Sequence, residues 1–175
     1  MDEHPFVALA REAIWHYSQT RTALCPEAEE GDPPPSGVFV SLHEAPPPGR
    51  SEGPLRGCIG TYEPRERNLR TEIARSAVAA AYSDPRFSPI RPDEIDDLDI
   101  TVYMLGEPER VHDVTDLDPS RYGVIVAGLG RRGLLLPAIH GIDTVDQQLE
   151  IALNKAGLTS DDPIDISRFK ATILK

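Results

Sequence analysis

Cysteine is scarce in this chain, with Cys25 and Cys58 the two among 175 residues. Disulfide frameworks occur in exported proteins whose cysteines are several and regularly spaced. The first residues, Met1 to Pro5, lack the basic and apolar stretches of a secretion signal. We therefore expect a cytoplasmic protein without disulfides. No run approaches the roughly 18–20 apolar residues of a membrane span, so we expect no membrane partner either.

Positive charge is also in short supply. The chain has 18 lysines and arginines against 29 aspartates and glutamates, which gives a formal net charge of −11. Binding to nucleic acid requires clustered basic side chains that neutralise phosphates. The acidic runs at 93–99 and 113–118 instead predict a solvated surface. We therefore expect an acidic protein with no nucleic acid partner.

Motifs for nucleotides and metals are missing too. The sequence contains no GxxxxGK(S/T) phosphate loop, no GxGxxG after a strand and no HExxH. Two cysteines and scattered histidines do not match the ligand spacing of a zinc site. The sequence predicts no cofactor and no metal.

Periodic apolar residues predict the secondary structure. Helices are predicted at residues 5 to about 20–24, 68–82 and 145–156. Strands are predicted at 38–43, 55–62, 98–105, 122–127, 134–136 and 164–174. The proline-rich segments 27–36 and 44–54 predict exposed loops. Because strands come mostly as hairpins and helices as separate blocks, we expect one α+β domain over residues 1–175, with a mostly antiparallel sheet and packed helices.

Local signals define the ends of two of these elements. Thr144 with Gln147 predicts a capping box at the start of the third helix, and Gly157 predicts its end. The glycines between 128 and 133 predict the turn of the hairpin that follows residue 122.

The segment Leu55–Thr61, with the sequence LRGCIGT, has a composition unusual for a strand. Gly57 and Gly60 flank Cys58, although glycine weakens a strand unless another backbone or a ligand approaches closely. Alternation places Arg56 and Cys58 on one face of the strand, and Gly60 continues that face. A guanidinium beside a thiol favours the reactive thiolate. The pattern therefore indicates a nucleophilic or ligand-binding cysteine.

A structural interpretation of the same residues stays open. Free cysteines are among the most buried residue types, and most are inert. In this interpretation Arg56 pairs with a carboxylate and does not act on the Cys58 thiol. Cys25 lies at a helix end before Pro26 and has no chemical groups around it in the sequence.

A nucleophilic cysteine needs a base, and two histidines are candidates. His43 ends the strand 38–43 and would lie near Cys58 if the two strands pair. His140 follows a predicted strand and precedes Gly141, which places it on a loop.

The turn Asp84-Pro85-Arg86-Phe87 carries an acid and a base. A salt bridge that anchors the loop is the ordinary role for such a pair, and substrate contact by Arg86 is the alternative. Phe87 is expected to fill the core.

Five sequence blocks together resemble one known family. Residues 55–60, LRGCIG, resemble the signature hexapeptide of the AMMECR-one domain family. The other blocks appear in family order and are GVFVSL at 37–42, DPRFSP at 84–89, RGLLLP at 132–137 and KAGL at 155–158. The resemblance extends from about Ala10 to Phe169. One departure is that many relatives have a Trp-Asp pair after the LLLP proline, whereas residues 142–148 contain no tryptophan.

The resemblance implies a fold and a cellular setting. Family members have two subdomains, and the hexapeptide faces a cleft between them. This implies a cleft lined by Leu55, Gly57, Ile59, Gly60, Thr61 and Arg86. Prokaryotic members resemble protein A of the AmmeMemoRadiSam system, which is associated with a Memo-like protein and a radical S-adenosylmethionine enzyme. No catalytic activity is established for the family.

Two functional hypotheses follow. The first is an accessory or binding component of an AmmeMemoRadiSam-like system, which uses the cleft lined by Leu55–Gly60. The second is a cysteine-dependent enzyme with Cys58 as nucleophile and Arg56 stabilising a thiolate or an anion, while Arg86 orients a carboxylate or phosphate. We favour the first, because a catalytic cysteine normally requires a base oriented by a third group.

Overall fold

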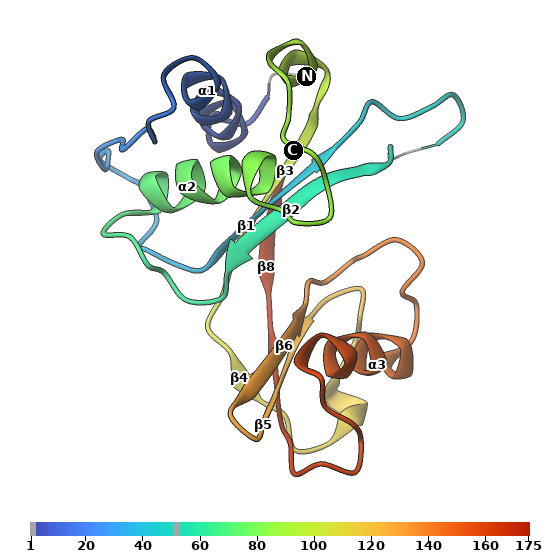
Figure 1. The fold of residues 1–175 in the computed structure, drawn as a ribbon. Coiled ribbons are helices and arrows are strands. Elements are labelled where there is room, and N and C mark those ends of the chain that lie inside the picture. The colour runs from blue at the N-terminus through green and yellow to red at the C-terminus, as the bar shows by residue number, and fades with distance from the viewer. Residues whose placement is uncertain (1–2, 51–52) are drawn as a thin grey trace. The chain divides into compact units, whose positions relative to one another are not determined.

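The computed structural model describes residues 3–50 and 53–175, whose strands form two four-stranded sheets (Figure 1). The chain divides into two units, one containing residues up to 105 together with 172–175 and the other residues 106–171. Every pairing with a described register is antiparallel. The predicted α+β fold with mostly antiparallel strands is confirmed, and the strands are divided between two sheets.

The first unit combines a sheet with helices on one face. It contains α1 (Pro5–Thr20), α2 (Leu69–Tyr82) and a short 3-10 helix, η1 (Pro92–Asp97). Its sheet has the strand order β2 (Leu55–Thr61), β1 (Val38–His43), β3 (Asp99–Leu105) and β8 (Ala171–Leu174). The helices α1 and α2 pack on each other, and α2 also packs on β1 and β2 (Figure 1).

Sequence features explain why these helices form where they do. Pro5 occupies the first turn of α1, where its missing N–H is no loss. The Asn68 side chain accepts a hydrogen bond from the Thr71 N–H and so caps α2. Val38, Val40 and Leu42 of β1 are fully buried and belong to the same core cluster as the apolar residues of both helices. Of the two helices, α2 packs on β1 and α1 packs on β3. This burial is the main stabilisation of the first unit.

The second unit is built on a smaller sheet. Its strand order is β4 (Glu109–Arg110), β7 (Asp165–Phe169), β5 (Gly123–Gly128) and β6 (Arg131–Leu135). The 3-10 helix η2 (Val114–Asp116) and the helix α3 (Val145–Ala156) complete the unit, and α3 packs on β5 and β6 (Figure 1). The predicted capping box of Thr144 and Gln147 is present, and Gly157 ends α3 in the left-handed conformation with φ of 63°.

Two predictions about the second unit need correction. The strand predicted at 164–174 is two strands, β7 and β8, which belong to different sheets. The predicted hairpin turn lies at Leu129 and Gly130, whereas Gly128 and Gly133 are strand residues. Gly133 is required because a Cβ there would lie 2.0 Å from the Ala152 carbonyl oxygen of α3.

The two proline-rich segments contain no helix or strand among their described residues, as predicted. Residues 51 and 52 of the second segment lie outside the described residues. Across residues 3–50 and 53–175, no helix is both long enough and apolar enough to cross a membrane.

Candidate functional site

The segment Leu55–Thr61 forms β2, which is the edge strand of the first sheet. It pairs with β1 in a register that places Cys58 opposite Ser41 and Gly60 opposite Phe39. The predicted pairing of the two strands is therefore confirmed. Cys58 is half-buried, and Cys25 is exposed.

Neighbouring atoms lie so close to Gly57 and Gly60 of β2 that only glycine fits at these positions. A Cβ at Gly57 would lie 2.2 Å from the Ala80 carbonyl oxygen of α2. A Cβ at Gly60 would lie 2.1 Å from the Val38 carbonyl oxygen and 2.5 Å from the Phe39 ring. Separations this short exclude any side chain. The fold alone therefore accounts for both glycines.

Arg56 is the extra residue of a β-bulge, since Gly57 pairs with Leu42 and Leu55 with His43. A bulge re-aims side chains, and the strict alternation assumed from the sequence ends here. The Arg56 guanidinium donates to the carbonyl oxygens of Ser88 (2.6 Å) and Pro89 (3.3 Å). It also forms an ion pair of 3.1 Å with Glu94. Arg56 therefore ties β2 to the segment before η1.

The carboxylate of Glu94 is held ionised by this network. Burial raises the pKa of Glu94, but hydrogen bonds from the Arg91 N–H and the Arg56 guanidinium outweigh it and keep the pKa below its usual value. Arg56, at 9% exposure, is paired and hydrogen-bonded as a buried charge requires.

The residues that surround the Cys58 backbone are Asp84 and Arg86. The Cys58 N–H donates to Asp84 Oδ2 at 2.9 Å, and Arg86 Nη2 donates to the Cys58 carbonyl oxygen at 3.3 Å. Asp84 and Arg86 also pair with each other, with 2.7 Å between Oδ2 and Nη2. The loop after α2 thus provides a donor and an acceptor at the outer edge of β2, as a neighbouring strand would.

Charge at this edge is fixed by the same pair. The Arg86 guanidinium lowers the pKa of Asp84 to about 2, against the opposing effect of burial and with help from the Cys58 and Arg86 backbone N–H groups. The hydrogen bond to Asp84 in turn raises the pKa of Arg86. The Asp84 side chain is 2% exposed, whereas that of Arg86 is 55% exposed. A permanent positive charge therefore lies beside Cys58 and reaches solvent.

The turn around Arg86 departs from prediction at one residue. The expected salt-bridged anchor is present. Phe87, expected in the core, is half-buried, and the Arg86 guanidinium lies 5.3 Å from its ring centroid. The prediction for Phe87 is wrong because its ring supports Arg86 at the surface.

His43 is held at both ring nitrogens. Its Nδ1 lies 2.9 Å from the Gly53 carbonyl oxygen, and its Nε2 lies 2.9 Å from Ser41 Oγ. Ser41 is in turn the residue opposite Cys58. His140 belongs to the second unit and lies on an exposed turn between β6 and α3.

The remaining residues expected to line a cleft contribute to the first unit. Gly57 is buried, and Leu55, Ile59, Gly60 and Thr61 are half-buried. Thr61 Oγ1 donates to the buried Glu72 at 2.8 Å. Glu72 also accepts the N–H groups of Arg65 (2.7 Å) and Glu66 (2.8 Å), so it anchors the loop after β2. Thr61 is therefore part of this anchor.

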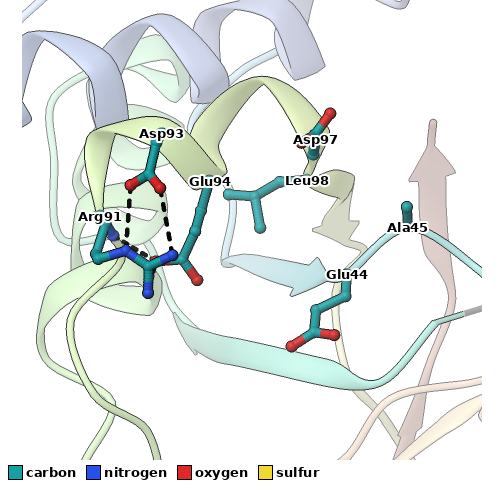
Figure 2. Close-up of a pocket in the computed structure, with 7 residues that line it drawn as sticks. All are labelled: Glu44, Ala45, Arg91, Asp93, Glu94, Asp97 and Leu98. Atoms are coloured by element: carbon teal, nitrogen blue, oxygen red, sulfur yellow. Dashed lines mark hydrogen bonds and ion pairs between the residues drawn. The ribbon is translucent and has the colours of Figure 1, made fainter.

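A pocket that the sequence did not predict lies beside the ion pair of Arg56 and Glu94. Its volume is about 270 Å³, and it is lined by Glu44, Ala45, Arg91, Asp93, Glu94, Asp97 and Leu98 (Figure 2). Arg91 pairs with Asp93 at 3.1 Å, as the dashed lines in Figure 2 show, which neutralises part of the lining. Within the described residues, no group of three or more histidine, cysteine or acidic side chains is arranged to hold a metal ion.

Comparison with known proteins decides the family. The family model AMMECR1 matches residues 7–174. This chain belongs to the AMMECR1 family. A Thermotoga maritima protein is 47% identical over 171 residues, which is 95% of each chain. The crystal structure of the uncharacterized protein PH0010 from Pyrococcus horikoshii is similar with a TM-score of 0.83 and 31% identity, covering 96% of this chain and 88% of that one.

The AMMECR1 domain also occurs within a longer protein. Protein CA_C1420 from Clostridium acetobutylicum is 42% identical over 175 residues, covering 98% of this chain but 36% of that protein. The family assignment confirms the resemblance carried by the five sequence blocks. AMMECR1 proteins have no characterised function among these relatives.

The sequence predicted the salt bridge of Asp84 but not its contact with Cys58. Its partner Cys58 is 26 residues away, and no periodic pattern relates the two. The available signal was the DPRF turn itself, in which a buried acid precedes an exposed base.

Proposed function

We propose that this AMMECR1 chain is a binding module that presents the outer edge of β2, with Arg86, to a protein partner. The observation that carries the proposal is the closure of this edge by Asp84 and Arg86 around Cys58. Gly57, Gly60 and Arg56 make contacts within the fold, whereas the Arg86 guanidinium is exposed to solvent. Arginine is enriched at the centres of protein interfaces.

The partners we propose are a Memo-like protein and a radical S-adenosylmethionine enzyme of an AmmeMemoRadiSam-like system. The family assignment supports this setting through the resemblance described above. A module that also occurs as 36% of a longer clostridial protein fits a role beside other domains. A partner surface with a carboxylate or phosphate would complement Arg86.

The proposal is tested by binding of the purified chain to these two proteins from the same genome, measured by isothermal titration calorimetry. Cys58→Ser is expected to bind as the parent does. Arg86→Gln is expected to weaken binding about tenfold or more, because one charged interface group is lost. Arg91→Gln is the matched control, since Arg91 is 67% exposed against 55% for Arg86 and likewise pairs with an aspartate two residues away. Failure of the parent to bind either protein would refute the proposal.

A cysteine-dependent enzyme is the second candidate, because a guanidinium contacts Cys58. The group in that position is Arg86, which donates to the Cys58 carbonyl oxygen, whereas Arg56 binds residues 88–94. In this alternative Cys58 is the nucleophile, and Arg86 stabilises its thiolate in place of Arg56. The alternative predicts that Cys58→Ala keeps the fold and partner binding but abolishes turnover of the reconstituted system. Full turnover by a folded Cys58→Ala protein would exclude it.

A further inference from the structure

Polar side chains cross the face of the first sheet that points away from α1 and α2. The buried residues Val38, Val40 and Leu42 point towards the helices, so the alternate residues of β1 point to the other face. The register places Cys58 of β2 and Thr101 of β3 on either side of Ser41. Cys58, Ser41 and Thr101 therefore form one row across three strands. Ser41 is 5% exposed and Thr101 3% exposed, so this row is largely withdrawn from water.

Ser41 and Cys58 form the closer of the two kinds of antiparallel pair. The Cys58 N–H points outward to Asp84, so it takes no part in the ladder with β1. Residues paired without ladder hydrogen bonds have Cα atoms about 4.5 Å apart, and their side chains are neighbours on one face. The side chains of Ser41 and Cys58 are therefore cross-strand neighbours on this face.

Ser41 also contacts a histidine that is held in one orientation. A carbonyl oxygen only accepts hydrogen bonds, so the 2.9 Å contact with Gly53 assigns the hydrogen to His43 Nδ1. The neutral ring then accepts the Ser41 hydroxyl hydrogen at Nε2, also over 2.9 Å. The same Gly53 carbonyl remains bonded when the ring becomes positively charged. This is the arrangement of a base oriented by a third group.

We propose that Ser41 and His43 form a proton relay that converts the Cys58 thiol to the thiolate at neutral pH. The thiol proton passes to Ser41 Oγ while the Ser41 proton passes to His43 Nε2, which leaves a thiolate and an imidazolium. Ser41 and His43 are positioning residues, and Cys58 is the residue that meets the substrate. The substrate class is a carbon electrophile with an anionic group, which the exposed Arg86 guanidinium binds.

Other charged and titratable groups lie around this relay. Asp99 of β3 is opposite His43, and Tyr103 is opposite Phe39 further along the same face. Asp84 and Arg86 lie at the outer edge of Cys58. The positive Arg86 favours a thiolate on Cys58, whereas the Asp84 carboxylate paired with it acts in the opposite direction.

Alkylation by iodoacetamide measures thiolate formation directly. The thiolate electron pair forms a bond to the methylene carbon, the carbon–iodine bond breaks and iodide leaves with its electron pair. The proton taken up by His43 then passes to solvent. The rate at Cys58 is followed by mass spectrometry from pH 5.5 to 9.5, and the exposed Cys25 is the internal control in the same molecule.

The relay predicts a specific pattern of rates. His43→Gln and Ser41→Ala are expected to slow alkylation of Cys58 at pH 7 about tenfold or more, since a positioned base contributes roughly 10²–10⁴-fold. At pH 9.5, where hydroxide ionises thiols directly, the variants and the parent are expected to converge. Ser41→Thr keeps the hydroxyl and is expected to retain the parent profile. Thr101→Val, on the other side of Ser41, is the matched control and is expected to change nothing.

The inference develops the cysteine-dependent alternative and is independent of partner binding. Equal slowing at pH 7 and pH 9.5 would refute the relay, because a purely structural effect on access does not depend on pH. Unchanged rates in both variants would also refute it while leaving a reactive Cys58 in place. Labelling of parent Cys58 only after unfolding would refute the relay and the enzyme alternative together, whatever the calorimetry shows.

Discussion

Replacing Asp84 by asparagine tests whether the closed edge of β2 is held by charge. In the folded protein the pKa of Asp84 is lowered from 3.8 to about 2, chiefly by the Arg86 guanidinium. One pKa unit corresponds to about 1.4 kcal/mol, so the ionised carboxylate contributes about 2 kcal/mol to the free energy of unfolding at pH 7. Asparagine retains an acceptor for the Cys58 N–H but loses this charged contribution.

The sign of the pH dependence follows from the lowered pKa. Because the unfolded chain binds the proton more tightly, the stabilisation is complete above about pH 5 and is lost as the pH falls towards 2. The difference between the parent and Asp84→Asn is therefore expected to shrink from about 2 kcal/mol at pH 7 to about 1 kcal/mol at pH 3. This difference is measured by urea unfolding. The unfolding is monitored by circular dichroism and by the fluorescence of Trp15 in α1, which reports on the first unit.

The matched control is Asp93→Asn, because Asp93 also pairs with an arginine two residues away but is 72% exposed. Surface ion pairs of this kind contribute little to stability. We therefore expect the control to follow the parent at every pH. A difference for Asp84→Asn that stays constant from pH 7 to pH 3, or an equal effect of Asp93→Asn, would refute the reasoning.

Two further predictions concern the residues of the signature segment. Gly57→Ala is expected to destabilise the first unit by about 1–3 kcal/mol in urea unfolding, because its Cβ would lie 2.2 Å from the Ala80 carbonyl oxygen. A stability equal to that of the parent would show that α2 can move away without cost. Arg56→Ala is expected to cost at least about 2 kcal/mol, because it removes hydrogen bonds from a charged group and leaves Glu94 with Arg91 as its remaining cation. A midpoint of thermal unfolding for Arg56→Ala equal to or above that of the parent would contradict a stabilising role of Arg56.

Local signals in the sequence predicted the helices well. Pro5 and the Thr144–Gln147 pair act within one turn of the helices they start, so their effect is readable from spacing alone. The strand pairing of β1 and β2 was also foreseeable, because a proline-rich loop joins two apolar runs. The five blocks that resemble the family predicted the fold class for the same reason, since they are short and contiguous.

The parts that failed depend on contacts between distant residues. The contacts of Arg56 with residues 88–94 depend on a bulge, set by the register with β1, which breaks the alternation assumed for β2. The alternating pattern of residues 164–174 does not show that they form two strands. Phe169 and Ile173 fit the alternation of a single strand even though β7 and β8 belong to different sheets. Ser41 has no unusual neighbours in sequence, and its position beside Cys58 follows from register alone.

The course of the chain between β3 and β8 has a consequence for synthesis on the ribosome. These strands are neighbours in the first sheet, yet residues 106–170, nearly the whole second unit, are translated between them. The nascent first unit therefore carries an uncovered β3 edge until β8 emerges, and uncovered edges recruit other strands. Early folding of the second unit would bring β8 to that edge sooner. Slow translation through this segment is therefore expected to lengthen the time for which the β3 edge stays uncovered.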